Sequence, residues 1–316
     1  MCTISVLMSI YNESEKELNE SIASVLNQTY RDFEFIIVND NPQNEELKTI
    51  LKKWINIDER IKIIENKRNI GLALSLNKAA EIAKGKYLAR MDADDISLKD
   101  RFEKQVAYLE KNSYMDLVCS NFYFINDRSQ IIDRKFDYFS TKQLKRLLTV
   151  WNTVHHPTVM MKKTSFLEVG GYRDFPCAQD YDLWLRMLNN NCNFYMLHEK
   201  LLKYRIRENS TTSSKRLLQV LTMNYIKQLN KERLKKGFDS YSEANYRNYL
   251  ISKKYFDDNY TKDLINKRKS FRNIQANIRE RNYFKAILRL LYLIYVSDYF
   301  RNRFFTVLEF KILNKF

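Results

Sequence analysis

Three aspartates, Asp92, Asp94 and Asp95, directly follow the apolar stretch 87–91. Carboxylates at this density beside a strand end need a positive partner, and alternation along an extended chain turns Asp92 and Asp94 to the same side. Two hard oxygen ligands suit Mg²⁺ or Mn²⁺, which keep several waters and take substrate phosphates as further ligands. The spacing therefore predicts a divalent-metal site that serves a nucleotide-diphosphate substrate.

A helix cap is the simpler interpretation of the same residues. Asp94 or Asp95 could only cap a helix that begins near Ser97 or Leu98. The elements around the aspartates are needed to decide between the two.

Apolar strand patterns alternate with amphipathic helix patterns over the first part of the chain. The strands are expected at residues 3–10, 33–38, 60–64 and 86–91. Helical spacing of apolar residues follows each of the first three, and Gly85 is expected to end the third helix. This alternation predicts an α/β fold with a mostly parallel sheet covered by helices on both faces.

The polar clusters that follow these strands are expected to converge. Ligands of such sheets bind beyond the carboxyl ends of the strands. The clusters at 11–13, 39–41 and 92–95 follow the first, second and fourth strands. Their convergence on one rim favours the metal site over the helix cap.

The composition bounds the class of protein. A chain of 316 residues can hold one large or two modest domains, and its formal net charge of +16 favours acidic partners such as nucleotides, anionic lipids or nucleic acid. No uncharged apolar run is long enough for a transmembrane helix, and the N-terminus lacks the basic region of a signal peptide, so we expect a cytoplasmic protein. Four widely spaced cysteines without zinc spacing favour reduced thiols.

Five ordered motifs resemble those of family 2 glycosyltransferases, which transfer a sugar from a nucleotide-sugar donor. The motifs lie at residues 4–12, 24–30, 37–40, 69–72 and 91–95. The resemblance covers residues 1 to about 210 and includes bacterial capsular or exopolysaccharide and O-antigen enzymes. It implies inverting transfer and the GT-A (Rossmann-like) fold, a mixed, mostly parallel sheet with helices on both faces.

The resemblance also implies a domain plan. We expect a catalytic domain at 1–214, with a nucleotide-sugar-binding half at 1–96 and an acceptor half at 97–214, followed by a helical, basic, aromatic-rich region at 215–316.

The same resemblance assigns the donor site. Tyr11 is expected to stack on or flank the nucleobase and Asp40 to accept from a pyrimidine N–H, while Asp92 reaches ribose or metal and Asp94 binds the metal, Mn²⁺ or Mg²⁺. Alternatives are a half-buried strand-end aromatic for Tyr11 and a turn residue ahead of Pro42 for Asp40. The full nucleotide-sugar-binding set implied is Ser9, Tyr11, Glu13, Asp40, Asn69, Arg90, Asp92 and Ala93.

Inverting transfer needs a carboxylate that takes the proton from the acceptor hydroxyl. Asp180 matches the position where the family usually shows Glu-Asp, and it is expected to be this base. Gln179 replaces the usual acid, which removes a nearby charge and is expected to lower the basicity of Asp180. Asp182 is the nearest competitor, with a solvent-facing place on the first turn of a helix as its alternative.

Five residues are expected on the acceptor or diphosphate side: His156, Gly171, Gln179, Trp184 and Arg207. Gly171 belongs to a loop that resembles the one under the donor sugar, although an ordinary turn explains it as well. His156 is expected to line the cleft, and a structural role is the alternative. Arg207 stands where a histidine is common, and because arginine offers only donors it suits the diphosphate and not a metal.

The C-terminal third is basic and helical in pattern. The apolar segment 286–296 contains Arg289 and is too short to span a bilayer. Basic residues flank it, including Arg279, Arg281 and Arg303, so contact of 279–303 with an anionic membrane surface is one interpretation. A core helix or a homodimer contact is the other.

We therefore expect transfer of a single hexose from a UDP-sugar to a saccharide acceptor that is linked to a lipid diphosphate, in surface polysaccharide biosynthesis. The absence of Gln-x-x-Arg-Trp disfavours a processive synthase, and the absence of a glycine-rich phosphate loop disfavours a nucleotidyltransferase. A teichoic-acid or protein glycosyltransferase is the neighbouring alternative. A basic protein that binds nucleic acid or membrane without catalysis is the alternative of another class, although nucleic-acid binding is not expected, because the organised motifs are acidic.

Overall fold

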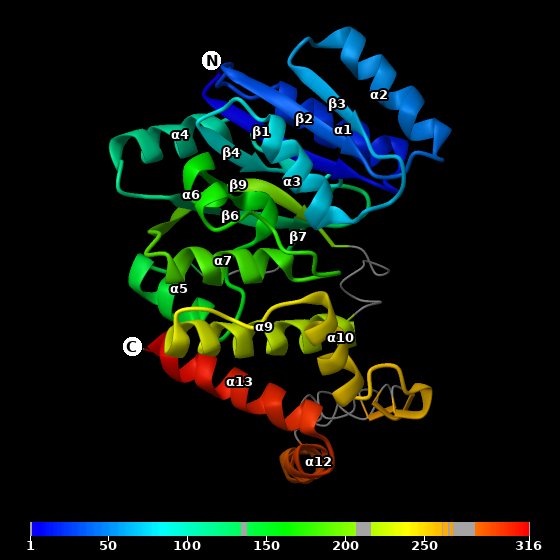
Figure 1. Cartoon of the computed structure of the whole chain (residues 1–316), viewed down its shortest axis with the longest axis vertical. Helices are drawn as coiled ribbons and strands as arrows, with labels where there is room; N and C mark the ends of the chain where they lie inside the picture. Colours follow the sequence, from blue (N-terminus) through cyan, green and yellow to red (C-terminus); the bar gives the residue numbers. More distant parts are fainter. Residues whose placement is uncertain are drawn as a thin grey trace. The chain divides into compact units, whose positions relative to one another are not determined.

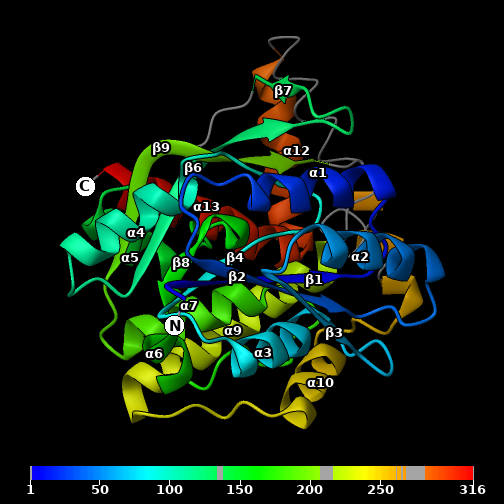
Figure 2. The ribbon, with the colours of Figure 1, turned by 90° about the horizontal axis from the view of Figure 1, so that it is seen from above.

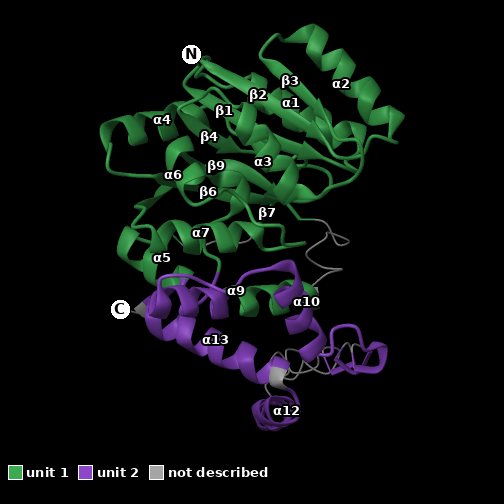
Figure 3. Cartoon of the chain, in the orientation of Figure 1, with its two compact units in different colours: residues 1–148, 152–226 green, residues 149–151, 227–316 purple. Residues whose placement is uncertain are grey.

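The computed structural model describes residues 2–133, 138–206, 216–260, 262–264, 266–267 and 282–315. The chain falls into two compact units (Figure 3): residues 1–148 with 152–226, and residues 149–151 with 227–316. The first unit holds the sheet, and the second is helical.

The sheet of the first unit is mixed, and the strands that lead to the predicted nucleotide-sugar site are parallel. Its strands are β1 (Ile4–Ile10), β2 (Phe33–Asn39), β3 (Ile61–Glu65), β4 (Tyr87–Arg90), β5 (Ile96–Ser97), β6 (Leu117–Ile125), β7 (Ile131–Ile132), β8 (Met160–Lys162) and β9 (Phe194–Arg205). They lie in the order β3-β2-β1-β4-β8-β6-β9-β5, with β7 paired to β6. β1 to β4 are mutually parallel, β8 runs against β4 and β6, and β9 runs parallel to β6.

Helices flank both faces of this sheet (Figures 1 and 2). They are α1 (Glu15–Leu26), α2 (Glu45–Ile57), α3 (Leu72–Ile82), α4 (Arg101–Lys111), α5 (Thr141–Leu148), α6 (Lys163–Glu168) and α7 (Gln179–Asn189), with a short 3₁₀ turn at His156–Thr158. α1, α2 and α4 cover one face, while α3 and α7 cover the other (Figure 2). The predicted α/β fold with helices on both faces is confirmed.

Alternation along the strands builds two cores. On β1, Ile4, Val6, Met8 and Ile10 pack in one cluster with apolar residues of α1, α2 and α4. Leu7, which points the other way, is equally buried. Burial on both faces explains why β1 and β2 read as continuous apolar runs.

Gly85 does not end α3 as expected. The helix stops at Ile82, with Ala83 as its C-cap. A Cβ at Gly85 would lie 2.4 Å from the backbone nitrogen of Ser5, so glycine is needed for close approach to β1. The Gly85 amide donates to the Ser5 hydroxyl at 2.8 Å.

The second unit contains the C-terminal helices. α9 (Arg216–Lys236) begins in the first unit and ends in the second, which also holds α10 (Glu243–Ser252), α12 (Tyr283–Val296) and α13 (Asp298–Lys315). Among the residues that the structure describes, no helix combines the length and apolar character needed to cross a membrane.

Candidate active site

The acidic turn at 92–95 follows β4 at the rim of the sheet. Asp92 and Asp94 are partly exposed, whereas Asp95 is buried. The Asp95 amide donates to the Asp92 carbonyl at 3.3 Å, which closes the turn. β5 comes next, and a helix begins only at Arg101. The alternative in which Asp94 or Asp95 caps a helix is therefore wrong.

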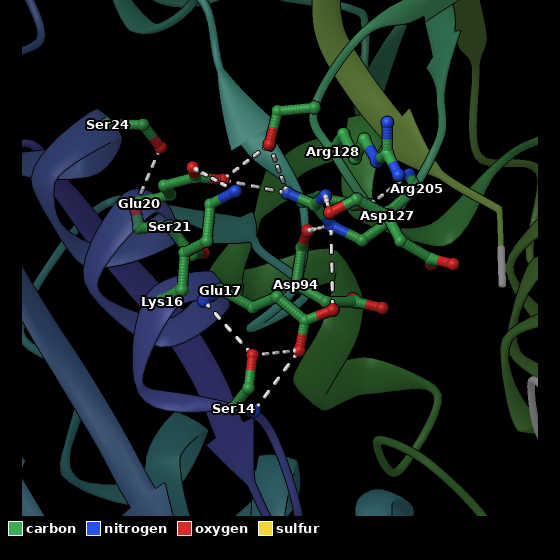
Figure 4. A network of polar contacts seen from close by, with 12 residues as sticks. Ser14, Lys16, Glu17, Glu20, Ser21, Ser24, Asp94, Asp127, Arg128 and Arg205 are labelled. Atoms are coloured by element: carbon green, nitrogen blue, oxygen red, sulfur yellow. Dashed lines mark hydrogen bonds and ion pairs between the residues drawn. The ribbon is translucent and has the colours of Figure 1, made fainter.

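Arg205, the last residue of β9, ties this turn to its surroundings (Figure 4). Its backbone N–H donates to Oδ1 of Asp95 at 2.8 Å, and its Nε donates to the Asp94 carbonyl at 2.7 Å. Nη2 donates to the Glu20 carboxylate of α1 at 2.9 Å, and Nη1 donates to the Asn126 carbonyl at 2.9 Å. One buried guanidinium thus holds the turn, α1 and the β6–β7 connection together.

The carboxylates of the turn are crowded and partly desolvated. Burial, together with the charges of Asp94 and Asp92, raises the pKa of Asp95 well above its usual range. Oδ2 of Asp95 is buried and has no hydrogen-bond partner within the described residues. This accumulation of negative charge favours a bound cation.

The donor set fits Mg²⁺ or Mn²⁺. In the described part of the chain, no three Asp, Glu, His or Cys side chains come together as a metal-binding group. The turn offers the carboxylates of Asp92 and Asp94, and the remaining coordination positions would fall to water and a diphosphate. Mg²⁺ sites commonly have this composition.

Arg90, the last residue of β4, lies beside the turn with only 2% of its surface exposed. Its Nη2 pairs with the Asp92 carboxylate. Its Nε and Nη1 are buried and have no hydrogen-bond partner among the described residues. Unpaired buried donors are costly, so these two nitrogens are suited to a ligand that carries acceptor oxygens.

Tyr11 stands at the end of β1 with 43% of its surface exposed, and Ser9 is partly exposed. The Tyr11 amide donates to Oε2 of Glu13 at 2.7 Å, and its carbonyl accepts from Nδ2 of Asn41 at 2.9 Å. These bonds fix the backbone after β1 while the ring stays accessible. A ring must be accessible in this way to stack on a nucleobase.

Asp40 is only 3% exposed, and it anchors the loop ahead of α3. Its Oδ1 accepts from Nδ2 of Asn66 at 2.8 Å and from the Ile70 amide at 2.9 Å, and its Oδ2 accepts from the Gly71 amide at 2.8 Å. Exposed Asn69 also accepts from the Gly71 amide, at 2.9 Å. The structure thus shows a loop-anchoring role for Asp40, and base recognition by the same carboxylate stays a prediction.

Asp180 is the second residue of α7 and has the properties of a general base. Its Oδ2 accepts from Nδ2 of Asn152 at 2.8 Å. Burial raises the pKa of Asp180 to about 6, the Asn152 hydrogen bond lowers it, and the charge of Asp92 adds to the rise. The two carboxylates are therefore electrostatic neighbours. A carboxyl with this pKa is mostly ionised at neutral pH and basic enough to accept a proton.

The start of α7 is held by a buried ion pair. Asp182 is fully buried, so the alternative of a solvent-facing side chain is wrong. It pairs with Arg186 at 2.7 Å and lies 3.7 Å from the guanidinium of Arg173. Asp182 therefore stabilises the helix that carries Asp180. Gln179, the first residue of α7, is 7% exposed.

The glycine turn at 170–171 is held by hydrogen bonds from side chains of α3 and α7. Gly171 has a φ of 65°, and a Cβ there would lie 2.7 Å from Oδ1 of Asn77. Asn77 donates to the Tyr172 carbonyl at 2.8 Å and accepts from the Tyr172 amide at 2.9 Å. Arg186 donates to the Gly171 carbonyl at 2.6 Å. The positive φ and the close packing both require glycine.

His156 begins the 3₁₀ turn and is 8% exposed. Its Nε2 is 2.6 Å from the Tyr172 hydroxyl. Burial, with a contribution from Arg90, lowers the pKa of His156 well below its usual range, so the ring is neutral at pH 7. Trp184 is fully buried, and its ring centroid lies 6.0 Å from that of His156. Trp184 thus supports His156 from the core and does not form the acceptor surface as expected. Arg207 lies outside the described residues.

Sequence reasoning missed the residues that hold the site in shape. Arg205 and Asn152 fall outside the expected site. Their signals were weak, because Arg205 lies two residues before the expected Arg207 and Asn152 is a polar residue in a loop. Gln28, from the motif at 24–30, proves structural. Its Nε2 donates to the Ser97 hydroxyl at 3.1 Å, and its Oε1 accepts from the Phe102 amide at 3.1 Å, which joins α1 to α4.

Comparisons with known proteins agree with this geometry. The model of the family described as "Glycosyl transferase family 2" matches residues 5–170. The chain is 38% identical over 214 residues to the O-antigen biosynthesis glycosyltransferase WbnJ of Escherichia coli, covering 67% of this chain and 82% of that protein.

A second Escherichia coli relative is named UDP-Gal:alpha-D-GlcNAc-diphosphoundecaprenol beta-1,3-galactosyltransferase. It is 30% identical over 205 residues, covering 64% of this chain and 73% of its own length. Among solved structures, S. aureus TarS (residues 1–349, in complex with UDP-GlcNAc) superposes with a TM-score of 0.60 at 19% identity, covering 78% of this chain and 70% of that one.

Proposed function

Because the chain belongs to glycosyl transferase family 2 and is a glycosyltransferase, we propose that it transfers a single hexose from a UDP-sugar, with inversion, to a saccharide acceptor. Two similar proteins support the choice of donor: the name of the galactosyltransferase relative includes UDP-Gal, and the TarS structure contains UDP-GlcNAc. The basic chain, with a net charge of +16, suits an anionic donor.

One observation carries the mechanism: the Asp180 carboxyl, with a pKa raised to about 6, lies in the electrostatic neighbourhood of the acidic turn. Asp180 takes the proton of the acceptor hydroxyl as that oxygen attacks the anomeric carbon. The bond between this carbon and the β-phosphate oxygen breaks, and UDP leaves. The proton passes from Asp180 to water, which restores the base.

The acidic turn and Arg90 serve the diphosphate. Asp94 and Asp92 would hold Mn²⁺ or Mg²⁺, which when bound offsets the charge that develops on the leaving group. Nε and Nη1 of Arg90, which have no hydrogen-bond partner among the described residues, donate to oxygens of the nucleotide sugar. Tyr11, with its exposed ring, stacks on the nucleobase, and Ser9 and Asn69 line the same rim.

The acceptor is proposed to be a saccharide on a lipid diphosphate, in surface polysaccharide biosynthesis. The names of the two relatives support this, since one refers to O-antigen biosynthesis and the other to a diphosphoundecaprenol-linked sugar. Such an acceptor places the enzyme at the cytoplasmic face of a membrane.

Release of the nucleoside diphosphate, measured over a panel of UDP-, GDP- and dTDP-sugars with Mn²⁺, Mg²⁺ or EDTA, tests the proposal. The wild type should turn over one UDP-sugar in a metal-dependent way. Asp180→Asn should lose turnover and still bind UDP by calorimetry, whereas Asp94→Ala should lose both turnover and metal-dependent binding.

Asp100→Asn, at a partly exposed aspartate that pairs with Lys104 on the neighbouring helix, is the matched control and should keep full activity. Undiminished turnover in Asp180→Asn would exclude Asp180 as the base. Absence of metal-dependent binding of any nucleotide would exclude the proposed reaction.

A further inference from the structure

α12 carries its apolar side chains on the outside. Only Ala286 and Leu293 are buried on this helix. At 100° per residue, the exposed apolar side chains cover the half of the helix opposite these two. They are Tyr283, Phe284, Ile287, Leu288, Leu291, Tyr292 and Tyr295, each between 52% and 82% exposed. A contiguous apolar face of this kind marks an interaction surface.

Charge distinguishes the possible occupants of this face. Residues 282–315 carry six basic side chains (Lys285, Arg289, Arg301, Arg303, Lys311 and Lys315) against two acidic ones (Asp298 and Glu309). A second copy of the chain would bring the same positive excess to the contact. An anionic lipid surface attracts this positive excess, and each Lys or Arg near such a surface strengthens binding by roughly fivefold.

A cavity of about 270 Å³ lies at the C-terminal end of α12. Its lining residues are Tyr260, Lys267, Tyr295, Val296, Ser297 and Arg301. Tyr295 is also the most exposed residue of the apolar face, at 82%, so the cavity adjoins that face.

The polar lining of this cavity suits a phosphate. Arg301 donates through Nε to the Ile294 carbonyl at 3.2 Å and through Nη2 to the Tyr295 carbonyl at 2.9 Å, which fixes its guanidinium at the helix end. Lys267 pairs with Asp263 at 2.6 Å. Ser297 is 6% exposed, and its hydroxyl has no hydrogen-bond partner in the described residues. A buried hydroxyl without a partner beside two cations matches the oxygens of a phosphate ester.

We propose that α12 lies in the interface of an anionic bilayer, with its exposed apolar face at the acyl boundary, and that the cavity binds the headgroup phosphate of an anionic phospholipid. An amphipathic helix with aromatic and aliphatic side chains on one face and basic flanks has the composition of an in-plane membrane helix. At 14 residues, α12 is too short to span. This surface does not depend on the transfer reaction.

Sedimentation of the full chain with vesicles, in the absence of nucleotide sugar, tests the surface. Phosphatidylglycerol/phosphatidylcholine vesicles should bind the protein, and phosphatidylcholine vesicles should bind it at least about tenfold less well, with the difference shrinking as salt rises. The double variant Leu288→Glu/Leu291→Glu should reduce binding more than about tenfold, since both side chains are already exposed and their loss spares the core. Ile57→Glu/Ile82→Glu, at exposed apolar positions of the first unit, is the matched control and should bind as the wild type does.

The cavity is tested by Lys267→Gln and Arg301→Gln, each of which should weaken binding to the anionic vesicles about fivefold. Ser297→Ala should weaken it by a smaller factor. Equal binding to both kinds of vesicle, or a Leu288→Glu/Leu291→Glu variant that binds as the wild type does, would overturn the proposal. A dimer by light scattering that this variant dissociates, without vesicle binding, would instead assign the face to a second copy.

Discussion

Asn152→Ala should move the pH dependence of transfer toward higher pH. The substitution removes the hydrogen bond that lowers the pKa of Asp180. A hydrogen bond to a charged group contributes roughly 1.5–3 kcal/mol, and about 1.4 kcal/mol corresponds to one pKa unit. Because Asp180 is only partly buried and water can replace the amide, we expect a rise of about one unit from its value of about 6. At pH 7 the ionised fraction then falls from about nine tenths to about one half.

The assay is kcat/KM for UDP-sugar transfer from about pH 5 to about pH 9, which reports ionisations of the free enzyme. The wild type should rise to a plateau with a midpoint near pH 6, because only the ionised Asp180 accepts the proton. The variant should reach a similar plateau at higher pH. Asn112→Ala is the control, since it removes a side-chain amide that donates to the Tyr108 carbonyl of the helix it follows. A wild-type midpoint near pH 4, or an Asn152→Ala profile that stays in place or moves to lower pH, would refute the role of Asp180.

Three further outcomes follow from the same structure. The folded-state pKa of Asp180, about 6, lies above its ordinary value of 3.8, so the folded state loses stability as pH rises from about 4 to about 6. At pH 7, Asp180→Asn should therefore raise the free energy of unfolding, by up to about 2 kcal/mol after solvent screening. At pH 4, the variant and the wild type should have nearly the same stability. Arg205→Met leaves buried acceptors unpaired and should lower the free energy of unfolding in urea by about 3–5 kcal/mol; a change below about 1 kcal/mol would contradict the anchoring role. Gly85→Ala should destabilise by about 3 kcal/mol, because its Cβ meets the backbone of β1, whereas Gly71→Ala, with nothing within 4 Å and a φ of 85°, should lose only about 1 kcal/mol in the same melts.

The arrangement of the first four strands could be predicted because their burial on both faces leaves continuous apolar runs. Parallel strands then bring their carboxyl ends to one edge, so the convergence of Tyr11, Asp40 and the acidic turn follows from strand order alone. The side-chain partners could not be predicted in this way. Arg205 reaches Asp95 across 110 residues of sequence, and only the pairing of β9 with β5 and β6 creates that contact.

Burial also gives some residues a structural role that their local sequence pattern did not predict. Asp182 has the spacing of an exposed first-turn acid, yet the fold encloses it with Arg186. Trp184 shares a helix with Asp180, yet its ring turns to the core and packs on His156. Asp180 and Trp184 lie about one turn apart on the same helix, and a one-dimensional pattern cannot tell which of the two side chains faces the core.

Two buried arginines show how the fold tolerates so many carboxylates at one strand end. Arg101 is fully buried and donates to the Arg90 carbonyl at 2.7 Å, and burial lowers its pKa to about 9. Arg205 donates to the Asp94 carbonyl. Both cations thus bind backbone oxygens of the segment that leads into and through the acidic turn, so they supply compensating charge while fixing its backbone. A turn held in this way does not need to reorganise when a diphosphate binds, which is the condition under which electrostatic stabilisation of a leaving group is most effective.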